Sequence, residues 1–325
     1  MHRKVLALVA LLAAAASLPP YSASARIVDS SDSQPGSQAA PPAASPALQP
    51  ILAQIPANPA LWTVHGLKGT AYLFGSFHAL PSNVDWHTKR IDAAMAEADA
   101  FVFEMAMDES VKTKLLAAVK EKGLLPEGQH LHDLLSPAAA RELDAQLAAL
   151  HLSAAAIGRM RPWLANITIE TAMLEKENYK PASGIEMQLE GADRKDDRPI
   201  IALETPEQQL ALIVPTDPKA EIQAFESALT DAHKENSADE IGPLLDAWIR
   251  GDVDKLDLLM NRELALYPDA RKLLIDDRNA HFADKIAELL EQPKTYFVTV
   301  GAAHLGGPHG VANLLRQKGF RVDGP

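Results

Sequence analysis

Two histidines stand three residues after a glycine, and each glycine ends a short apolar run. The runs 70–74 and 295–300 are rich in aromatic and β-branched residues and lead into two Gly-x-x-His tetrapeptides, which end on His78 and His304. An apolar run of this kind bounded by glycine is typical of a buried strand, and the glycine lets the backbone turn sharply. If the two strands share a sheet, both imidazoles project from the same edge of it and can converge.

Two carboxylates take the equivalent position after two further apolar runs. The run 100–103 ends on Glu104, and the run 198–203 ends on Glu204. In open α/β sheets, ligands bind beyond the carboxyl ends of the strands. Two imidazoles with one or two carboxylates suit a divalent ion such as Zn, Mn, Co or Fe, and they equally suit acid–base catalysis on a water molecule. Taken singly, each of the four side chains could instead be an exposed strand end.

Three other side chains each have two interpretations. Arg278 lies in an expected helix with Leu274 and Phe282, and it is either a surface arginine or an inward one that orients a carboxylate or grips substrate. Glu186 either begins a helix or faces the site. His309, in a glycine-rich turn after the second motif, is expected to face solvent rather than to act as an auxiliary ligand.

The elements that must position these residues alternate between short strands and long helices. Residues 61–74 predict a β-hairpin, and helices are expected over 86–98, 109–169 and 220–292, with breaks near glycine, serine or proline. Residues 205–208 combine an N-cap threonine, a proline and a capping-box glutamine, so a helix begins there. Strands separated by long helices indicate an α/β (α+β) fold with a central, mostly buried sheet and large helical insertions. We expect one such domain over residues 59–325.

The N-terminal residues predict export. Basic residues at positions 3 and 4 precede an apolar stretch, and small residues follow up to Ala25, so residues 1–25 are expected to be a signal peptide cleaved near Ala25. Residues 26–58 are rich in Pro, Ala and Ser and predict a disordered linker. The mature protein is therefore expected in the periplasm or in the medium.

Composition excludes several classes of protein. The chain has 31 Lys+Arg against 43 Asp+Glu, a net charge of −12, and no basic run, which argues against nucleic acid as a partner. The absence of cysteine rules out disulfides, thiolate metal sites and a cysteine nucleophile. No segment after the leader is long and apolar enough for stable membrane insertion. The sequence does not define an oligomeric state.

The region from about Trp62 to Val322 resembles the TraB/GumN family, the group that also includes the Tiki proteases. The motifs that carry this resemblance are, in chain order, Tyr72 to His78, the strand that ends on Glu104, Arg161-Pro162-Trp163, Gly184-Ile185-Glu186, Leu203-Glu204-Thr205 with Gln209, Trp248 with Gly251-Asp252, Arg278-Asn279, and Val300 to Leu305. Two Gly-x-x-His motifs in this order and at this distance are a specific signal. The family is also similar to erythromycin-esterase-like and ChaN-like proteins, some of which hydrolyse esters without a metal or bind haem.

The resemblance implies an exported hydrolase, and the Tiki relatives imply a peptidase that depends on a divalent metal, with manganese or cobalt favoured and zinc also feasible. It assigns His78, Glu104 and His304 to the metal. We expect Glu104 or Glu204 to act as general base and Arg278 to stabilise a developing oxyanion, on a peptide or protein substrate and without an organic cofactor. Two alternatives stay open. One is a metal-independent hydrolase in which His78 or His304 activates water beside a glutamate, and the other is a non-catalytic periplasmic protein that binds a peptide or haem.

Overall fold

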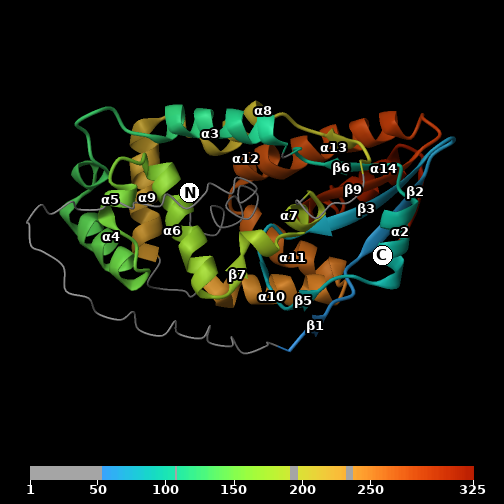
Figure 1. The fold of residues 1–325 in the computed structure, drawn as a ribbon, viewed down its shortest axis with the longest axis horizontal. Coiled ribbons are helices and arrows are strands. Elements are labelled where there is room, and N and C mark those ends of the chain that lie inside the picture. The colour runs from blue at the N-terminus through green and yellow to red at the C-terminus, as the bar shows by residue number, and fades with distance from the viewer. Residues whose placement is uncertain (1–52, 107, 191–196, 232–236) are drawn as a thin grey trace, which may run out of the picture.

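The computed structural model describes residues 53–106, 108–190, 197–231 and 237–325. They form a single domain with a central six-stranded sheet flanked by helices, which confirms the predicted fold class (Figure 1). The strand order is β10-β2-β3-β9-β6-β8. These strands are β2 (Leu61–His65), β3 (Thr70–Ser76), β6 (Ala100–Phe103), β8 (Ile200–Ala202), β9 (Thr295–Gly301) and β10 (Arg321–Asp323).

The register of the sheet brings the two Gly-x-x-His motifs together. Strands β3, β9, β6 and β8 are parallel neighbours, whereas β2 pairs antiparallel with both β3 and β10. Between β3 and β9, Gly75 lies opposite Val300 and Ser76 lies opposite Gly301. Both motifs therefore leave the sheet at the same edge, as the sequence predicts, and the residues that follow β6 and β8 leave it there too.

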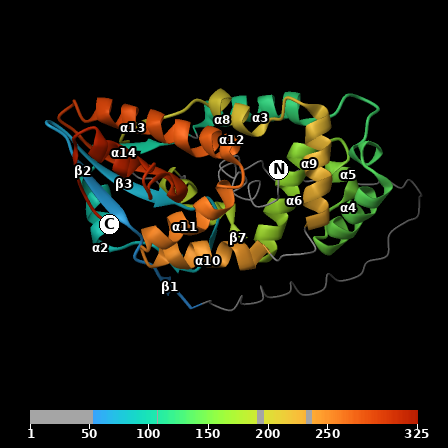
Figure 2. The ribbon, with the colours of Figure 1, turned by 180° about the vertical axis from the view of Figure 1, so that it is seen from behind.

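Helices cover both faces of the sheet, and further helices extend from one end of it (Figures 1 and 2). The helices before β8 are α2 (Lys89–Glu97), α3 (Glu109–Gly123), α4 (Pro137–Ala149), α5 (Ala154–Ile157), α6 (Pro162–Lys176) and α7 (Ile185–Glu190). Those after it are α8 (Pro206–Ile213), α9 (Pro218–Asp231), α10 (Ser237–Ile249), α11 (Val253–Leu264), α12 (Pro268–Arg271), α13 (Asp277–Leu289) and α14 (Val311–Gln317). A π-helical turn, Lys272–Asp276, joins α12 to α13, and a 3-10 turn, Ala302–His304, follows β9.

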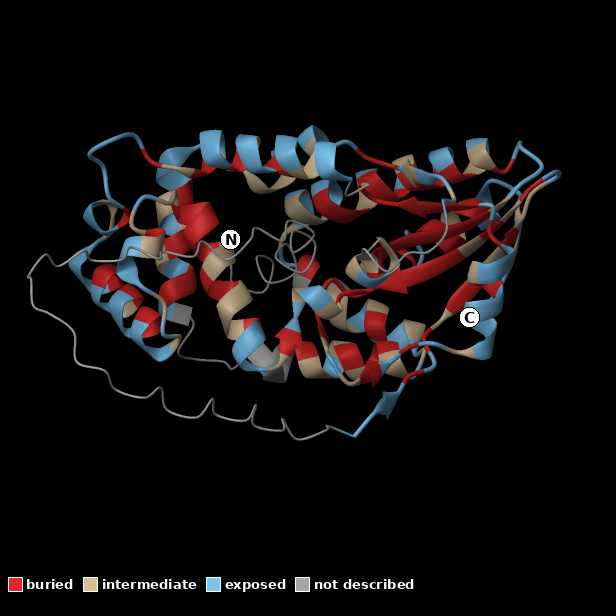
Figure 3. Ribbon diagram, in the orientation of Figure 1, coloured by how far each residue is buried: buried red, intermediate tan, exposed pale blue. Residues whose placement is uncertain are grey.

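The central strands of the sheet are buried on both faces, as their continuous apolar sequences require (Figure 3). One face packs aromatic side chains of β3, β6 and β9 against Trp86 and Trp248. The other face packs Leu73, Val102 and Val298 against α13 and α14. The strands β3, β9 and β6 are thereby packed from two sides, whereas the edge strands β8 and β10 are partly exposed.

Helices begin at the capping and proline residues that the sequence indicates. Thr205 and Gln208 form a complete capping box at the start of α8, and Pro162 opens α6, with Trp163 buried beside it. The helices α4, α5, α6 and α9 enclose their own apolar cluster. This cluster lies at the end of the molecule away from α13 and α14 (Figure 2).

Two details differ from the sequence-based expectation. Strand β10 was not expected, because a three-residue edge strand carries little apolar signal. The predicted linker 26–58 reaches into the folded region, since β1 (Ile55–Pro56) pairs with β5 (Val84–Asp85) and Ala57 is buried. The rest of that linker up to residue 52 and the predicted signal peptide 1–25 lie outside the described residues.

Within the described ranges, every helix is too short or too polar to cross a membrane.

Candidate functional site

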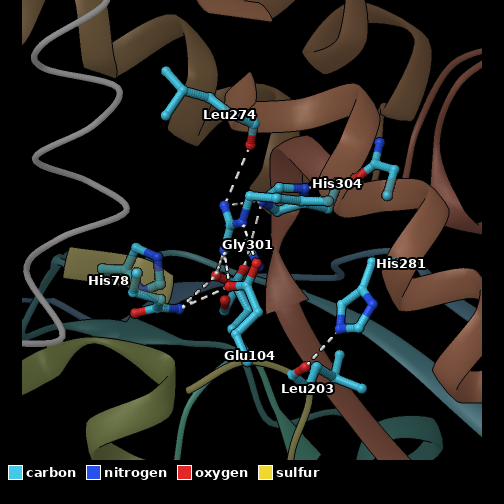
Figure 4. Close-up of polar contacts among 12 residues, drawn as sticks. His78, Glu104, Leu203, Leu274, His281, Gly301 and His304 are labelled. Atoms are coloured by element: carbon cyan, nitrogen blue, oxygen red, sulfur yellow. Dashed lines mark hydrogen bonds and ion pairs between the residues drawn. The ribbon is translucent and has the colours of Figure 1, made fainter. Parts of the chain in front are cut away.

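A buried arginine lies at the edge of the sheet where the motifs leave it. Arg278, on α13, donates from Nε to Glu204 Oε1 at 2.8 Å and from Nη2 to Glu204 Oε2 at 2.7 Å. The same Nη2 donates to Glu104 Oε2 at 2.5 Å. Its Nη1 lies 3.0 Å from His304 Nε2 and 3.3 Å from the carbonyl of Leu274. Arg278, Glu104, Glu204 and His304 therefore form one cluster, which we call the arginine cluster (Figure 4).

The strand pairing places the two carboxylates of the arginine cluster side by side. The backbone N–H of Glu204 donates to the backbone carbonyl of Glu104 at 2.7 Å, which extends the β6–β8 pairing by one step beyond the strands. Both side chains then face α13, and both are buried. Two carboxylates held side by side repel each other, and the guanidinium that bonds to both offsets this repulsion.

The protonation of His304 follows from its neighbours. Asn279 Nδ2 donates to the carbonyl of His309 at 2.8 Å, so Asn279 Oδ1 is the atom 2.6 Å from His304 Nδ1. An amide oxygen only accepts hydrogen bonds, so Nδ1 carries the proton and Nε2 accepts from Arg278. Burial and the adjacent Arg278 charge lower the pKa of His304 to about 3. His304 is thus a neutral imidazole with both ring nitrogens occupied.

Glu104 is a poor general base in this setting. Burial alone would raise its pKa, but Arg278, His304, His78 and the N–H of Gly301 outweigh it and hold the pKa of Glu104 at about 2. Its Oε1 accepts from the Gly301 N–H at 2.7 Å. A base is most effective when its pKa lies near the operating pH. The expected role of Glu104 as base therefore finds no support in its surroundings, and both oxygens of Glu204 are bound to Arg278.

Arg278 does not offer a donor to an oxyanion either. A guanidinium has five N–H donors. In the described residues, those of Arg278 face two oxygens of Glu204, one of Glu104, the Leu274 carbonyl and His304 Nε2. The inward orientation of Arg278, one of its two interpretations from sequence, is thus the one found. Its geometry is that of a residue that orients carboxylates.

The second histidine, His78, has a different environment. Its Nδ1 lies 2.8 Å from Glu186 Oε1 at ion-pair distance, in a direction that departs from that of a hydrogen bond. Its Nε2 is buried and has no hydrogen-bond partner among the described residues. Burial acts to lower the pKa of His78, but Glu186, followed by Glu104, outweighs it, so the pKa is raised above the ordinary value. In Figure 4, His78 lies apart from His304, with Glu104 between them, and His281 faces Leu203 instead.

Close backbone packing brings Glu186 to His78. A Cβ atom on Gly184 would come 2.2 Å from the carbonyl oxygen of His78, so only glycine fits there. The next residue, Ile185, donates its N–H to the Phe77 carbonyl at 3.0 Å. This contact places the first turn of α7 against the first Gly-x-x-His motif, and the hydroxyl of Ser76 donates to Glu186 Oε1. Glu186 therefore both begins a helix and faces the site.

Two of the three predicted metal ligands are held by other groups of the chain. Glu104 and His304 are already bound by Arg278, Gly301 and Asn279, whereas His78 Nε2 and Glu186 Oε2 have no hydrogen-bond partner in the described part of the chain. Among the described residues, no group of three or more His, Asp or Glu side chains is placed to hold a metal ion. Protein zinc sites use at least three protein ligands. His78, Glu104 and His304 as arranged do not fit a shared ion, and metal dependence stays a prediction from the family resemblance.

We expect the arginine cluster to make the free energy of unfolding fall as the solution becomes acidic. Between about pH 6.5 and pH 3, the unfolded chain protonates His304 whereas the folded chain does not, so the free energy of unfolding falls as the pH falls. Glu104 acts in the same direction between about pH 4.5 and pH 2. His78 has a raised pKa, so its stabilising contribution is complete below pH 6.5 and is lost only as the pH rises above 6.5, outside this range. We expect His304→Gln to reduce the slope by up to about 1.4 kcal/mol per pH unit between pH 6.5 and 4.5. Urea unfolding of both proteins across this range measures it, and equal slopes would contradict it.

Sequence reasoning gave no definite role to three residues of the site. Asn279 and Gln209 entered only as parts of family motifs, yet Asn279 fixes the proton on His304 and Gln209 Nε2 lies 3.4 Å from Glu104 and 3.3 Å from Glu204. Ser76 contacts Glu186, and its place inside the first motif was the available signal. His309 is exposed, as expected, and contributes its carbonyl rather than its ring.

Fold and site together define a class of protein. A parallel-centred α/β sheet presents two Gly-x-x-His motifs at one edge, beside a glutamate pair bound by a helix arginine. The TraB/PrgY/gumN family model matches residues 60–324, and the chain belongs to this family.

Two curated relatives extend the comparison. The chain is 22% identical over 255 residues to the uncharacterised protein YbaP of Shigella flexneri. This match covers 76% of this chain and 88% of YbaP. It is likewise 22% identical over 254 residues to YbaP of Escherichia coli (strain K12), with 75% and 87% covered. No solved structure matches the chain.

Proposed function

We propose that the protein is an exported hydrolase that cleaves peptides and in which His78 activates the attacking water. The observation that carries this proposal is the buried, unpartnered Nε2 of His78 beside Glu186 in the described part of the chain. A buried polar atom without a partner costs about 1–3 kcal/mol, so a water molecule or a substrate atom is expected to bind it. A carboxylate on one ring nitrogen and a free lone pair on the other is the arrangement of a general base.

The other candidates for the base are disfavoured by their contacts. His304 has both nitrogens occupied and a low pKa, and Glu104 and Glu204 are bound by Arg278. Of the two histidines that the sequence offers as bases, His78 alone has a ring nitrogen that no described residue contacts as a partner. The proposal therefore follows the metal-independent alternative from the sequence analysis, with Glu186 as the orienting carboxylate.

The substrate class and the location come from the family resemblance and the N-terminal sequence. The Tiki proteases within the resemblance support a peptide bond as the substrate, and the predicted signal peptide up to Ala25 supports the periplasm or the medium as the site of action. Fractionation of cells that express the full chain tests the location. A protein that keeps residues 1–25 and stays in the cytoplasm would contradict it.

A library of internally quenched fluorescent peptides, together with p-nitrophenyl acetate as an ester probe, tests the activity. The mature protein, which lacks the predicted signal peptide 1–25, is expected to cleave a subset of the peptides in the presence of EDTA. Absence of turnover with every probe, with and without added Mn²⁺, Co²⁺ or Zn²⁺, would contradict a hydrolase. Turnover that requires added metal would support the metal-dependent alternative and contradict this mechanism.

The pH profile tests the role of Glu186. His78 is a base only when neutral, so kcat/KM is expected to rise with pH through a midpoint above 6.5. Burial lowers the pKa of His78, and Glu186→Gln removes the largest contribution that raises it, leaving only the smaller one from Glu104. The midpoint should therefore move to lower pH, and the plateau of kcat/KM should fall by at least about tenfold because the ring is no longer oriented. The control is Glu127→Gln on an exposed turn, and an unchanged midpoint in Glu186→Gln would contradict the assignment.

A further inference from the structure

The arginine cluster has the composition of a cation site with the cation already supplied by the chain. Arg278 is 6% exposed in its side chain and lies among two carboxylates, an imidazole and a backbone carbonyl. Carboxylate oxygens and a neutral imidazole nitrogen are the donors that Mn²⁺, Co²⁺ and Zn²⁺ bind. Here both oxygens of Glu204, one oxygen of Glu104 and the Nε2 of His304 are within 3.0 Å of a guanidinium nitrogen instead.

The charges of the cluster explain why a cation is needed at this point. Glu104 and Glu204 are buried and held side by side by their backbone hydrogen bond, and the only other donors to their carboxylates given by the described residues are the Gly301 N–H and the Gln209 amide. These neutral donors do not balance two negative charges. His304 is neutral and presents its lone pair toward Arg278. One positive charge at the centre therefore organises all three side chains.

We infer that Arg278 is the resident cation of this site and takes the place that a divalent ion would otherwise fill among Glu104, Glu204 and His304. The guanidinium matches the two carboxylates with directed hydrogen bonds, which a fixed fork can do and a mobile ammonium cannot. Removing it would leave two carboxylates and one imidazole lone pair facing one space. As placed in the described structure these side chains do not hold an ion, so the three must move toward one another to bind a metal in the variant. The inference concerns this chain's own contacts and does not rest on the proposed hydrolase activity.

The test is a gain of metal binding. The mature protein without the predicted signal peptide and its Arg278→Ala variant are titrated with Zn²⁺ and with Mn²⁺. Binding is followed by calorimetry and by the midpoint of thermal unfolding. We expect Arg278→Ala to bind one ion per chain at least about tenfold more tightly than the wild type does, and to be stabilised by it. We expect the wild type to be purified with substoichiometric metal and to keep its unfolding midpoint in EDTA.

Arg161→Ala is the matched control. Arg161 also binds a buried glutamate, with its Nη2 2.5 Å from Glu221 Oε2, but Glu221 takes its other hydrogen bond from the Trp163 N–H. A single carboxylate does not make a metal site, so this variant should lose stability without gaining affinity for Zn²⁺ or Mn²⁺.

Two results would overturn the inference. One is a folded Arg278→Ala protein with the affinity of the wild type for both ions. The other is a wild-type protein that carries a stoichiometric divalent ion and loses it in the Glu104→Gln or His304→Gln variant, and this result decides the question even if Arg278→Ala fails to fold. If Arg278→Ala folds only when Zn²⁺ or Mn²⁺ is present, that outcome supports the inference. None of these measurements depends on finding a substrate.

Discussion

Replacing His78 with alanine is expected to lower kcat/KM by about 10²–10⁴-fold for the peptide that the wild type cleaves fastest. This is the range that a positioned general base contributes. Within the described residues, the Nε2 of His78 is the only ring nitrogen of the two motif histidines that has neither a hydrogen-bond partner nor an ion-pair partner, so His304 cannot take over its role. Far-UV circular dichroism and thermal unfolding should show a folded protein, because the main chain around position 78 is fixed by Phe77 and Gly184.

Chemical rescue separates the loss of a base from a structural effect. Added imidazole should restore part of the activity of His78→Ala, since the truncated side chain leaves space for the ring beside Glu186. His281→Ala is the control, because His281 is a partly buried histidine near the arginine cluster whose ring hydrogen bonds to the carbonyl of Leu203. Full activity in His78→Ala would refute the assignment, as would an equal loss in His281→Ala.

The convergence of the two motifs could be predicted from sequence because it depends on strand signals. The runs before Gly75 and Gly301 are apolar over most of their length, as buried parallel strands are, and parallel neighbours end at the same edge. Glu104 and Glu204 followed from the same rule. The close approach of the two turns has its own cause, since a Cβ on Gly75 would come 3.0 Å from Ala302 Cα.

What each polar group binds could not be read in the same way. Arg278 shares a helix face with Leu274 and Phe282, four residues before and after it, and this spacing was the signal for an inward side chain. Its partners follow β6, β8 and β9. Glu104 lies 174 positions earlier in the chain, Glu204 lies 74 positions earlier, and His304 lies 26 positions later. The expectation that His78, Glu104 and His304 share one ion treated these residues as if no other group competed for them. The guanidinium is that competitor.

Glu186 shows a second limit of the same kind. The loop before it gives no periodic signal, and its place beside His78 depends on a backbone contact between Gly184 and the first motif. A glycine followed by a helix start is common in sequences, whereas a glycine on which a Cβ would meet a carbonyl oxygen is visible only in three dimensions. The orienting carboxylate was therefore left open by the sequence, although the histidine that it orients was found.

Arg278→Ala is expected to lower the free energy of unfolding by about 3–5 kcal/mol in EDTA, because removal of one partner from a buried ion pair leaves uncompensated charge. Arg278 also joins α13 to the ends of β6 and β8, so its loss separates a covering helix from the sheet. Adding Glu204→Gln to Arg278→Ala should recover part of this loss, since one unpaired charge is then removed. Urea unfolding of the two single variants, the double variant and the wild type measures the coupling between the two residues. A loss below about 1 kcal/mol in Arg278→Ala, or strictly additive effects, would show that the guanidinium does not hold the carboxylates in place.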